Sequence, residues 1–170
     1  MILYIPLSFI LYIIALPVFL FSSFLMLLIS LANMRFFYFS LKYFCRIILF
    51  SMGLCPKING SFPKNDTFII MMNHSSFLDL FLFPLFMQGL WSCVTAKENF
   101  QYPVLSTILH RLKAIAINRN NNKEALQSIR LAEIAINDGY HIGILPEGSR
   151  TTTGRLGPLK KGGFHMAINT

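Results

Sequence analysis

The first 34 residues of the chain contain no charged side chain, and the first charge is Arg35. A helix that crosses a bilayer needs about 20 consecutive apolar residues, so this stretch is long enough for one tilted crossing. Pro17 lies in the middle of it and could kink the helix or divide it into two half-length helices. The stretch therefore predicts a membrane-embedded region, and it leaves open whether residues 1–33 span the bilayer or only dip into it.

A secretory signal peptide is the alternative interpretation of this stretch, with "SLA", Ser30 to Ala32, as a cleavage site. The segment lacks the Lys and Arg of a signal peptide's first part, and its apolar run exceeds the usual length of about 7 to 15 residues. The whole chain is also 54% hydrophobic and only 13% charged, whereas about a quarter of the residues of a soluble domain are charged. We therefore expect a membrane protein.

The next stretch, residues 35–54, contains few charges and many aromatic residues. On a helix, Arg35, Lys42 and Arg46 fall within a sector of roughly 40°, and apolar side chains fill the rest. A narrow basic stripe on an apolar helix is typical of the membrane interface, where cations contact anionic head groups. A core helix with one solvated edge would give the same pattern.

The charge balance gives an orientation and an expected partner. The chain has 15 Lys and Arg against 7 Asp and Glu, a net charge of +8, and every charge before Asp66 is basic. Positive charge after an apolar segment places the following domain on the cytoplasmic side, which in a bacterium is the inner face of the inner membrane. No nucleic-acid-binding motif or aromatic-interleaved basic cluster is present outside the membrane-like region. We expect anionic membrane phospholipid, and no nucleic acid, as the partner.

From about residue 57 the composition changes, because "CPKINGSFPKND" supplies the Pro, Gly, Asn and Asp of a turn or linker. Residues 1–56 are therefore assigned to a helical membrane-embedded or interfacial region and residues 57–170 to a second domain. In the second domain, short β-rich runs alternate with amphipathic ones. Strands are expected at 67–72, 92–96, 114–118 and 141–145, and helices at 77–88, 99–111 and 122–137. This alternation predicts an α/β fold, with a largely parallel sheet and flanking helices.

The carboxyl ends of parallel strands are where α/β proteins place their chemistry. Each expected strand is followed by polar or ionisable side chains, which are His74 and Asp79, then Lys97, then Arg119, then "PEGSR" at 146–150. All of them should lie on one rim of the sheet. This convergence predicts a site there.

His74 and Asp79 are five residues apart, so on one continuous helix they would point about 140° away from each other. They can meet only if His74 precedes the helix, with Ser75 or Ser76 as the N-cap and Asp79 in the first turn. Asp79 would then fix the His74 tautomer, and the other ring nitrogen could remove a proton from a hydroxyl. The simpler alternative is a capping box, in which Asp79 only accepts a backbone N–H.

Three cations follow the expected strands: Lys97, Arg119 and Arg150. Together they could form a phosphate pocket, and Gly148 would permit a tight turn beside it. Glu147 could orient Arg150 or a substrate group. The alternative is a set of solvated loop charges. The three cysteines, at 45, 55 and 93, show no metal-ligand or disulfide pattern and are interpreted as reduced, packed thiols.

The blocks "NHSSFLD", "AINRNN" and "LPEGSR", in this order and after an apolar start, resemble the glycerolipid acyltransferases, most closely the lysophosphatidate (1-acylglycerol-3-phosphate) acyltransferases. "AKENF" and "LKKGGFHMAI" also resemble family segments, and the likeness covers residues 60–168. That family has Thr where this chain has Ser149, which keeps the hydroxyl.

The resemblance implies a membrane-bound transferase of phospholipid biosynthesis that moves a fatty acyl group from acyl-CoA or acyl carrier protein to a lysophospholipid. His74 would be the general base and Asp79 its partner. Lys97, Arg119 and Arg150 would bind the acceptor phosphate, and Glu147, Gly148 and Ser149 would shape the pocket. The resemblance implies no metal and no cofactor beyond the thioester co-substrate. It leaves the acyl length, the donor and the acceptor open, with glycerol 3-phosphate or another lysolipid as alternatives.

The family pattern also includes a fourth block, a Pro-containing apolar strand, which these 170 residues do not contain. We therefore expect the acyltransferase domain to be C-terminally incomplete. A truncated lipid-binding relative without activity is the alternative to an enzyme.

Overall fold

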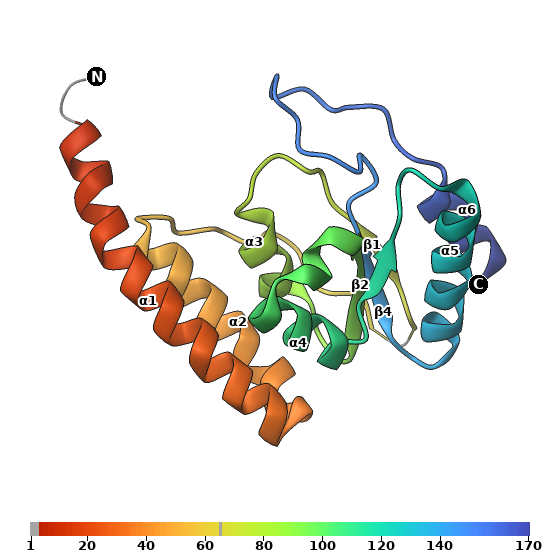
Figure 1. Ribbon diagram of the computed structural model, residues 1–170, viewed down its shortest axis with the longest axis horizontal. Helices are drawn as coiled ribbons and strands as arrows, with labels where there is room; N and C mark the ends of the chain where they lie inside the picture. The colour runs from red at the N-terminus through yellow and green to blue at the C-terminus, as the bar shows by residue number, and fades with distance from the viewer. Residues whose placement is uncertain (1–3, 65) are drawn as a thin grey trace. The chain divides into compact units, whose positions relative to one another are not determined.

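The computed structural model describes residues 4–64 and 66–170 (Figure 1). They form two compact units, one of Met1–Ser61 with Leu80–Met87 and one of Phe62–Asp79 with Gln88–Thr170. The sequence places the division at residues 56 and 57. The structure differs in giving residues 80–87 to the first unit, although they lie within the second domain along the chain.

The first unit is built on two consecutive long helices, α1 (Tyr4–Ala32) and α2 (Met34–Ser51), which pack against each other. Helix α1 runs through Pro17 without a break, so the residues do not form two half-length helices. Asn33 separates α1 from α2 and caps α2, because its side-chain oxygen accepts a hydrogen bond of 3.1 Å from the Phe36 N–H. The third element of this unit comes from helix α3 (Asp79–Phe86), whose Phe81 ring meets the Phe19 ring of α1 edge-on at 6.0 Å.

Much of the apolar surface of α1 is exposed. Within the described residues, one helical segment, Ser8–Ala32, is long and apolar enough to cross a membrane by length and composition. The 29 residues of α1 extend about 43 Å, which exceeds the hydrocarbon thickness of about 30 Å. The large apolar side chains of α1 that are more than half exposed are Phe9, Ile10, Tyr12, Ile13, Leu16, Leu20, Phe21, Phe24 and Leu31.

Helix α2 has one face packed and one face exposed. Its buried residues include Phe37, Cys45 and Leu49. On the exposed side, the Lys42 ammonium lies 5.6 Å from the ring centroid of Phe39 and 5.1 Å from that of Tyr43. This mixture of packed, aromatic and cationic surface fits both a helix at the membrane interface and a core helix with one solvated edge.

The second unit contains a four-stranded sheet in the order β1-β4-β2-β3, in which every neighbouring pair is parallel. The strands are β1 (Ile69–Met71), β2 (Trp91–Ala96), β3 (Ile115–Ile117) and β4 (His141–Ile144). The connections contain the 3-10 helix η1 (Lys97–Gln101) and helices α4 (Pro103–Arg111) and α5 (Asn122–Asn137), and α6 (Gly162–Asn169) follows β4. The predicted α/β fold with a parallel sheet is confirmed. Strands β1, β3 and β4 are shorter than expected, and β2 is one residue longer.

The core of the second unit lies between the sheet and the pair α5 and α6, which lie side by side (Figure 1). Its buried side chains are Ile115, Ala132, Ile136, Ile142 and Met166. Helix α6 approaches the sheet so closely at Gly163 that a Cβ there would lie 2.9 Å from Cε of Met71. Glycine at this position therefore lets α6 pack directly onto β1 and β4.

The cysteines are free thiols in different environments. Cys45 is buried, Cys93 is half-buried, and Cys55 is exposed, so the packed interpretation is wrong for Cys55. Burial raises the pKa of the Cys93 thiol to about 12, which keeps it protonated and unreactive at neutral pH.

Helix α5 has a side-chain cap that can be tested by mutation. The side-chain oxygen of Asn121 accepts hydrogen bonds from the N–H groups of Lys123 at 3.0 Å and Glu124 at 3.4 Å. Loss of an N-cap side chain costs about 1 kcal/mol, so Asn121→Ala should lower the free energy of unfolding by about that amount in a detergent-solubilised denaturant titration. Asn120→Ala, at the exposed neighbouring position, should change it by less than about 0.5 kcal/mol. Equal effects of the two substitutions would contradict the capping role.

Candidate active site

His74 lies in the loop between β1 and α3, just beyond the carboxyl end of β1. Its backbone is held from both sides by the segment that follows β4. The His74 N–H donates to Oε1 of Glu147 at 2.7 Å, and the His74 carbonyl accepts from the Thr151 N–H at 2.9 Å. The parallel pairing of β1 with β4 brings these two loops together, although they are 73 residues apart in sequence.

The imidazole of His74 contacts Asp79, as the sequence analysis requires for a working pair. Nδ1 of His74 lies 2.9 Å from Oδ2 of Asp79, and the two side chains are 19% and 4% exposed. An ionised carboxylate only accepts hydrogen bonds, so it favours the tautomer with the proton on Nδ1. Nε2 is then the nitrogen that can take a proton from a substrate.

Asp79 also organises the turn that contains His74. Its Oδ2 accepts hydrogen bonds from the N–H groups of Ser75 at 2.9 Å and Ser76 at 3.0 Å. Helix α3 begins at Asp79, later than the expected start at residue 77, because Ser76 Oγ accepts from the Leu78 N–H at 3.1 Å and shapes a turn before the helix. The Asp79 carboxylate therefore both pairs with His74 and accepts backbone N–H groups of the turn, so the two interpretations hold together.

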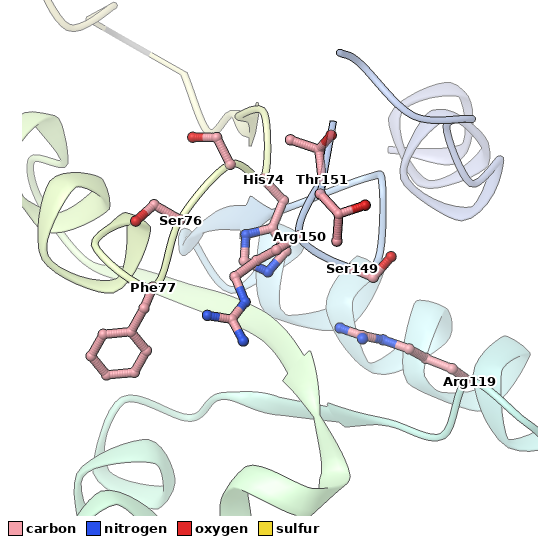
Figure 2. Close-up of a pocket in the computed structure, with 9 residues that line it drawn as sticks. His74, Ser76, Phe77, Arg119, Ser149, Arg150 and Thr151 are labelled. Atoms are coloured by element: carbon pink, nitrogen blue, oxygen red, sulfur yellow. The ribbon is translucent and has the colours of Figure 1, made fainter. Parts of the chain in front are cut away.

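A pocket of about 680 Å³ opens beside His74. Its lining residues within the described chain are His74, Ser75, Ser76, Phe77, Arg119, Ser149, Arg150, Thr151 and Thr152. Figure 2 shows the guanidinium groups of Arg119 and Arg150 directed toward the space next to the His74 ring. Two planar cations beside a base suit an anionic substrate such as a phosphate ester.

Glu147, expected as a pocket residue, is not among the described lining residues and is only 7% exposed. One of its carboxylate oxygens accepts the His74 N–H, and the other accepts the Gly157 N–H at 2.9 Å. These two hydrogen bonds, the one from His74 first, lower the pKa of Glu147. Glu147 is therefore ionised at neutral pH, and both of its carboxylate oxygens accept hydrogen bonds from backbone N–H groups.

Gly148 also acts through the backbone. It has a φ of +73°, a conformation that favours glycine, and its N–H donates to the Leu145 carbonyl at 3.0 Å. The resulting tight turn follows β4 and delivers Ser149 and Arg150 to the pocket.

Lys97 is exposed and does not line the pocket in the part of the chain that the structure describes. It is the first residue of the 3-10 helix η1, which starts where β2 ends. With an ordinary loop after β2, Lys97 would be expected beside the two arginines. The structure brings together Arg119 and Arg150 and leaves Lys97 outside this pocket.

Sequence reasoning missed five of the lining residues, namely Ser75, Ser76, Phe77, Thr151 and Thr152. Each lies within three residues after His74 or Arg150 in the sequence, and that proximity was the available signal. No group of three or more His, Cys, Asp or Glu side chains able to hold a metal occurs in the residues searched, 4–64 and 66–170.

A buried carboxylate paired with a histidine, at the carboxyl edge of a parallel sheet and beside two arginines, defines a site for acid–base chemistry on an anionic substrate. Comparison with known proteins gives the family. The family model described as Acyltransferase matches residues 56–170. The chain belongs to this acyltransferase family.

Several curated relatives carry the name 1-acyl-sn-glycerol-3-phosphate acyltransferase. The protein from Cocos nucifera is 32% identical over 126 residues, which cover 74% of this chain and 41% of the relative. The protein from Borreliella burgdorferi is 30% identical over 131 residues, which cover 74% of this chain and 51% of the relative. The chain thus spans about half the length, or less, of these relatives.

A solved structure shares the fold. The 1-acyl-sn-glycerophosphate (LPA) acyltransferase PlsC from Thermotoga maritima matches with a TM-score of 0.76 at 20% identity, covering 99% of this chain and 71% of that chain. This match confirms the fold expected from the sequence resemblance.

Proposed function

We propose that the protein transfers a fatty acyl group from an acyl thioester to the free hydroxyl of lysophosphatidate, which gives phosphatidate. The observation that carries the proposal is the His74–Asp79 pair, 2.9 Å apart, in one pocket with Arg119 and Arg150. The names of the curated relatives support the choice of acceptor. The thioester would come from acyl-CoA or acyl carrier protein.

The proposed reaction uses His74 as a general base and then as a general acid. Nε2 of His74 takes the proton of the acceptor hydroxyl while that oxygen bonds to the thioester carbonyl carbon. The tetrahedral intermediate collapses by breaking the C–S bond, and the imidazolium returns its proton to the sulfur of the leaving thiolate. Asp79 stabilises the imidazolium between these steps, because its carboxylate lies at Nδ1.

Arg119 and Arg150 are assigned to the phosphate of the acceptor. A guanidinium presents paired N–H donors that match two phosphate oxygens, and the charge of the phosphate strengthens each hydrogen bond. Both residues line the same pocket as His74. A phosphate held there would place a hydroxyl of the same molecule within reach of Nε2.

A membrane location follows from the same proposal. Lysophosphatidate and its product are lipids, and the exposed apolar side chains of α1 and the cations of α2 suit a bilayer and its anionic surface. We place the catalytic unit on the cytoplasmic face, because the charges that follow α1 are basic.

The experiment that tests the proposal uses membranes that contain the protein. The donor is acyl-CoA, or acyl carrier protein loaded with the same acyl group, and the three acceptors are lysophosphatidate, monoacylglycerol and glycerol 3-phosphate. Lysophosphatidate should be converted to phosphatidate, and monoacylglycerol, which lacks the phosphate, should react at least about 100-fold more slowly in kcat/KM if two or more hydrogen bonds to the phosphate are lost. Faster acylation of glycerol 3-phosphate than of lysophosphatidate would replace the proposed acceptor. Absence of acyl transfer to all three would refute the enzyme and favour a lipid-binding protein.

Arg150→Ala should raise the KM for lysophosphatidate by about 10- to 100-fold, because a hydrogen bond to a charged group contributes about 1.5 to 3 kcal/mol. The measurement is the acceptor KM in the membrane assay. The charge-matched control is Arg155→Ala, which removes an exposed arginine from the same loop and should leave the KM within about twofold, as for surface substitutions generally. An unchanged acceptor KM in Arg150→Ala would contradict the phosphate role.

A further inference from the structure

Glu147 holds two separate parts of the site through one buried carboxylate. Oε1 accepts the His74 N–H at 2.7 Å, and Oε2 accepts the Gly157 N–H at 2.9 Å. The first hydrogen bond fixes the backbone of the general base. The second closes the loop of residues 147–157 onto its own starting point.

The closed loop contains a large part of the acceptor pocket. Ser149, Arg150, Thr151 and Thr152 are four of the nine described lining residues. A further hydrogen bond of 2.8 Å, from the Lys160 N–H to the Pro146 carbonyl, ties the chain just beyond the loop to its beginning. Arg150 thus lies on a segment whose two ends meet at the Glu147 carboxylate.

From this geometry we infer that Glu147 is a positioning residue that couples the base His74 to the acceptor-binding loop of Arg150, and that it does not bind the substrate. This inference rests on the proposed function. Both carboxylate oxygens already accept backbone N–H groups, and the side chain lies outside the pocket lining. This arrangement can hold the base His74 and the phosphate-binding Arg150 at a fixed distance and orientation.

The requirement for a carboxylate follows from the donors. Both partners of Glu147 are N–H groups, so the side chain must accept at two atoms. Glutamine offers one accepting oxygen and one donating NH2 group, so Glu147→Gln must lose one of the two hydrogen bonds despite its equal size. The substitution should lower kcat/KM by about 100-fold, the effect of a displacement of about 1 Å in a positioned group, with a lower kcat and a higher acceptor KM.

Gly157→Ala disturbs the loop without changing the carboxylate or the pocket lining. A Cβ at this position would lie 3.2 Å from Oε2 of Glu147, so the loop end and the carboxylate must move apart by a few tenths of an ångström. Gly157 does not have a positive φ, so alanine can adopt its backbone conformation. We expect a higher KM for lysophosphatidate with kcat within twofold, whereas Leu156→Ala, at the exposed neighbouring position, should leave both constants unchanged.

The decisive kinetic comparison is a double-mutant cycle between Glu147→Gln and Arg150→Ala. If Glu147 acts through the loop of Arg150, the second substitution should raise the acceptor KM by less than threefold in the Glu147→Gln background, against 10- to 100-fold alone. Multiplicative effects on KM, as expected of two independent substrate ligands, would overturn the inference. A wild-type KM in Gly157→Ala would also overturn it.

Hydrogen exchange separates this inference from the proposed function, because it needs no activity. In Glu147→Gln, amides of residues 149–157 should exchange faster, while those of β4 and α5 keep their wild-type protection. Unchanged protection of the loop, or a uniform loss over the whole chain, would refute the positioning role. Loss of loop protection in a chain whose wild type transfers no acyl group would refute the proposed function alone.

Discussion

Replacing His74 with alanine is expected to reduce acyl transfer at least about 1000-fold, because general-base catalysis contributes about 10²- to 10⁴-fold and the variant also cannot protonate the leaving thiolate. The imidazole lies in the pocket with its Nδ1 occupied by Asp79. Its side chain is partly exposed, and within the described residues its hydrogen bond is the one to Asp79, so its removal should leave the fold intact. The measurement is the rate of phosphatidate formation at saturating acceptor and thioester.

The matched control is His165→Ala, which removes an exposed histidine from α6 and should retain the wild-type rate. The acceptor KM of any residual activity in His74→Ala should stay close to the wild-type value, since the arginines are untouched. A His74→Ala variant that keeps more than a tenth of the wild-type rate would show that the base lies elsewhere.

Replacing Asp79 with asparagine is expected to reduce the rate about 1000-fold while preserving the fold. The amide oxygen can still accept the N–H groups of Ser75 and Ser76, which now bond to Oδ2. With the amide oxygen in the place of Oδ2, it can also still accept a hydrogen bond from Nδ1 of His74. The neutral amide cannot supply the negative charge that stabilises the imidazolium, so the rate should fall although the turn is preserved.

Asp79→Ala provides the comparison that separates charge from structure. It leaves two backbone N–H groups of a partly buried turn without their acceptor, at a cost of up to about 1 to 3 kcal/mol for each one. Its melting temperature in detergent should therefore fall well below those of the wild type and of Asp79→Asn. Near-wild-type activity in Asp79→Asn would mean that the hydrogen bonds of Asp79 matter and its charge does not.

The parallel sheet was predictable because β-rich runs alternate with amphipathic runs along the second domain, and parallel pairing then places every strand's carboxyl end on one edge. The contact of His74 with Asp79 could be anticipated by elimination. A separation of five residues is incompatible with one helix face, so the histidine had to precede the helix, as it does here.

Other features lay beyond sequence reasoning for identifiable physical reasons. The partner of Glu147, the backbone of His74, is 73 residues away, and a motif does not show which way a side chain points. Lys97 starts a 3-10 helix, which has no strong residue signature. Helix α3 contains apolar residues on all sides, so its pattern did not reveal that residues 80–87 belong with α1 and α2.

Pro17 is a further case in which local chemistry was ambiguous. Proline in the interior of a helix removes one hydrogen bond and commonly bends or breaks the helix. In this chain α1 continues from Tyr4 to Ala32, and its packing against α2 supplies tertiary contacts that offset the lost bond. The alternatives of one helix or two could therefore be decided only with the packing in view.

The most direct test of the central claim is the stoichiometry of the reaction in membranes that contain the 170-residue chain. Free thiol released from the thioester and phosphatidate formed from lysophosphatidate should be measured in the same sample. The proposed mechanism predicts one thiol for each phosphatidate, and loss of both products in His74→Ala. Thiol release without phosphatidate would indicate hydrolysis, and formation of both products at equal rates in wild type and His74→Ala would contradict catalysis at this site.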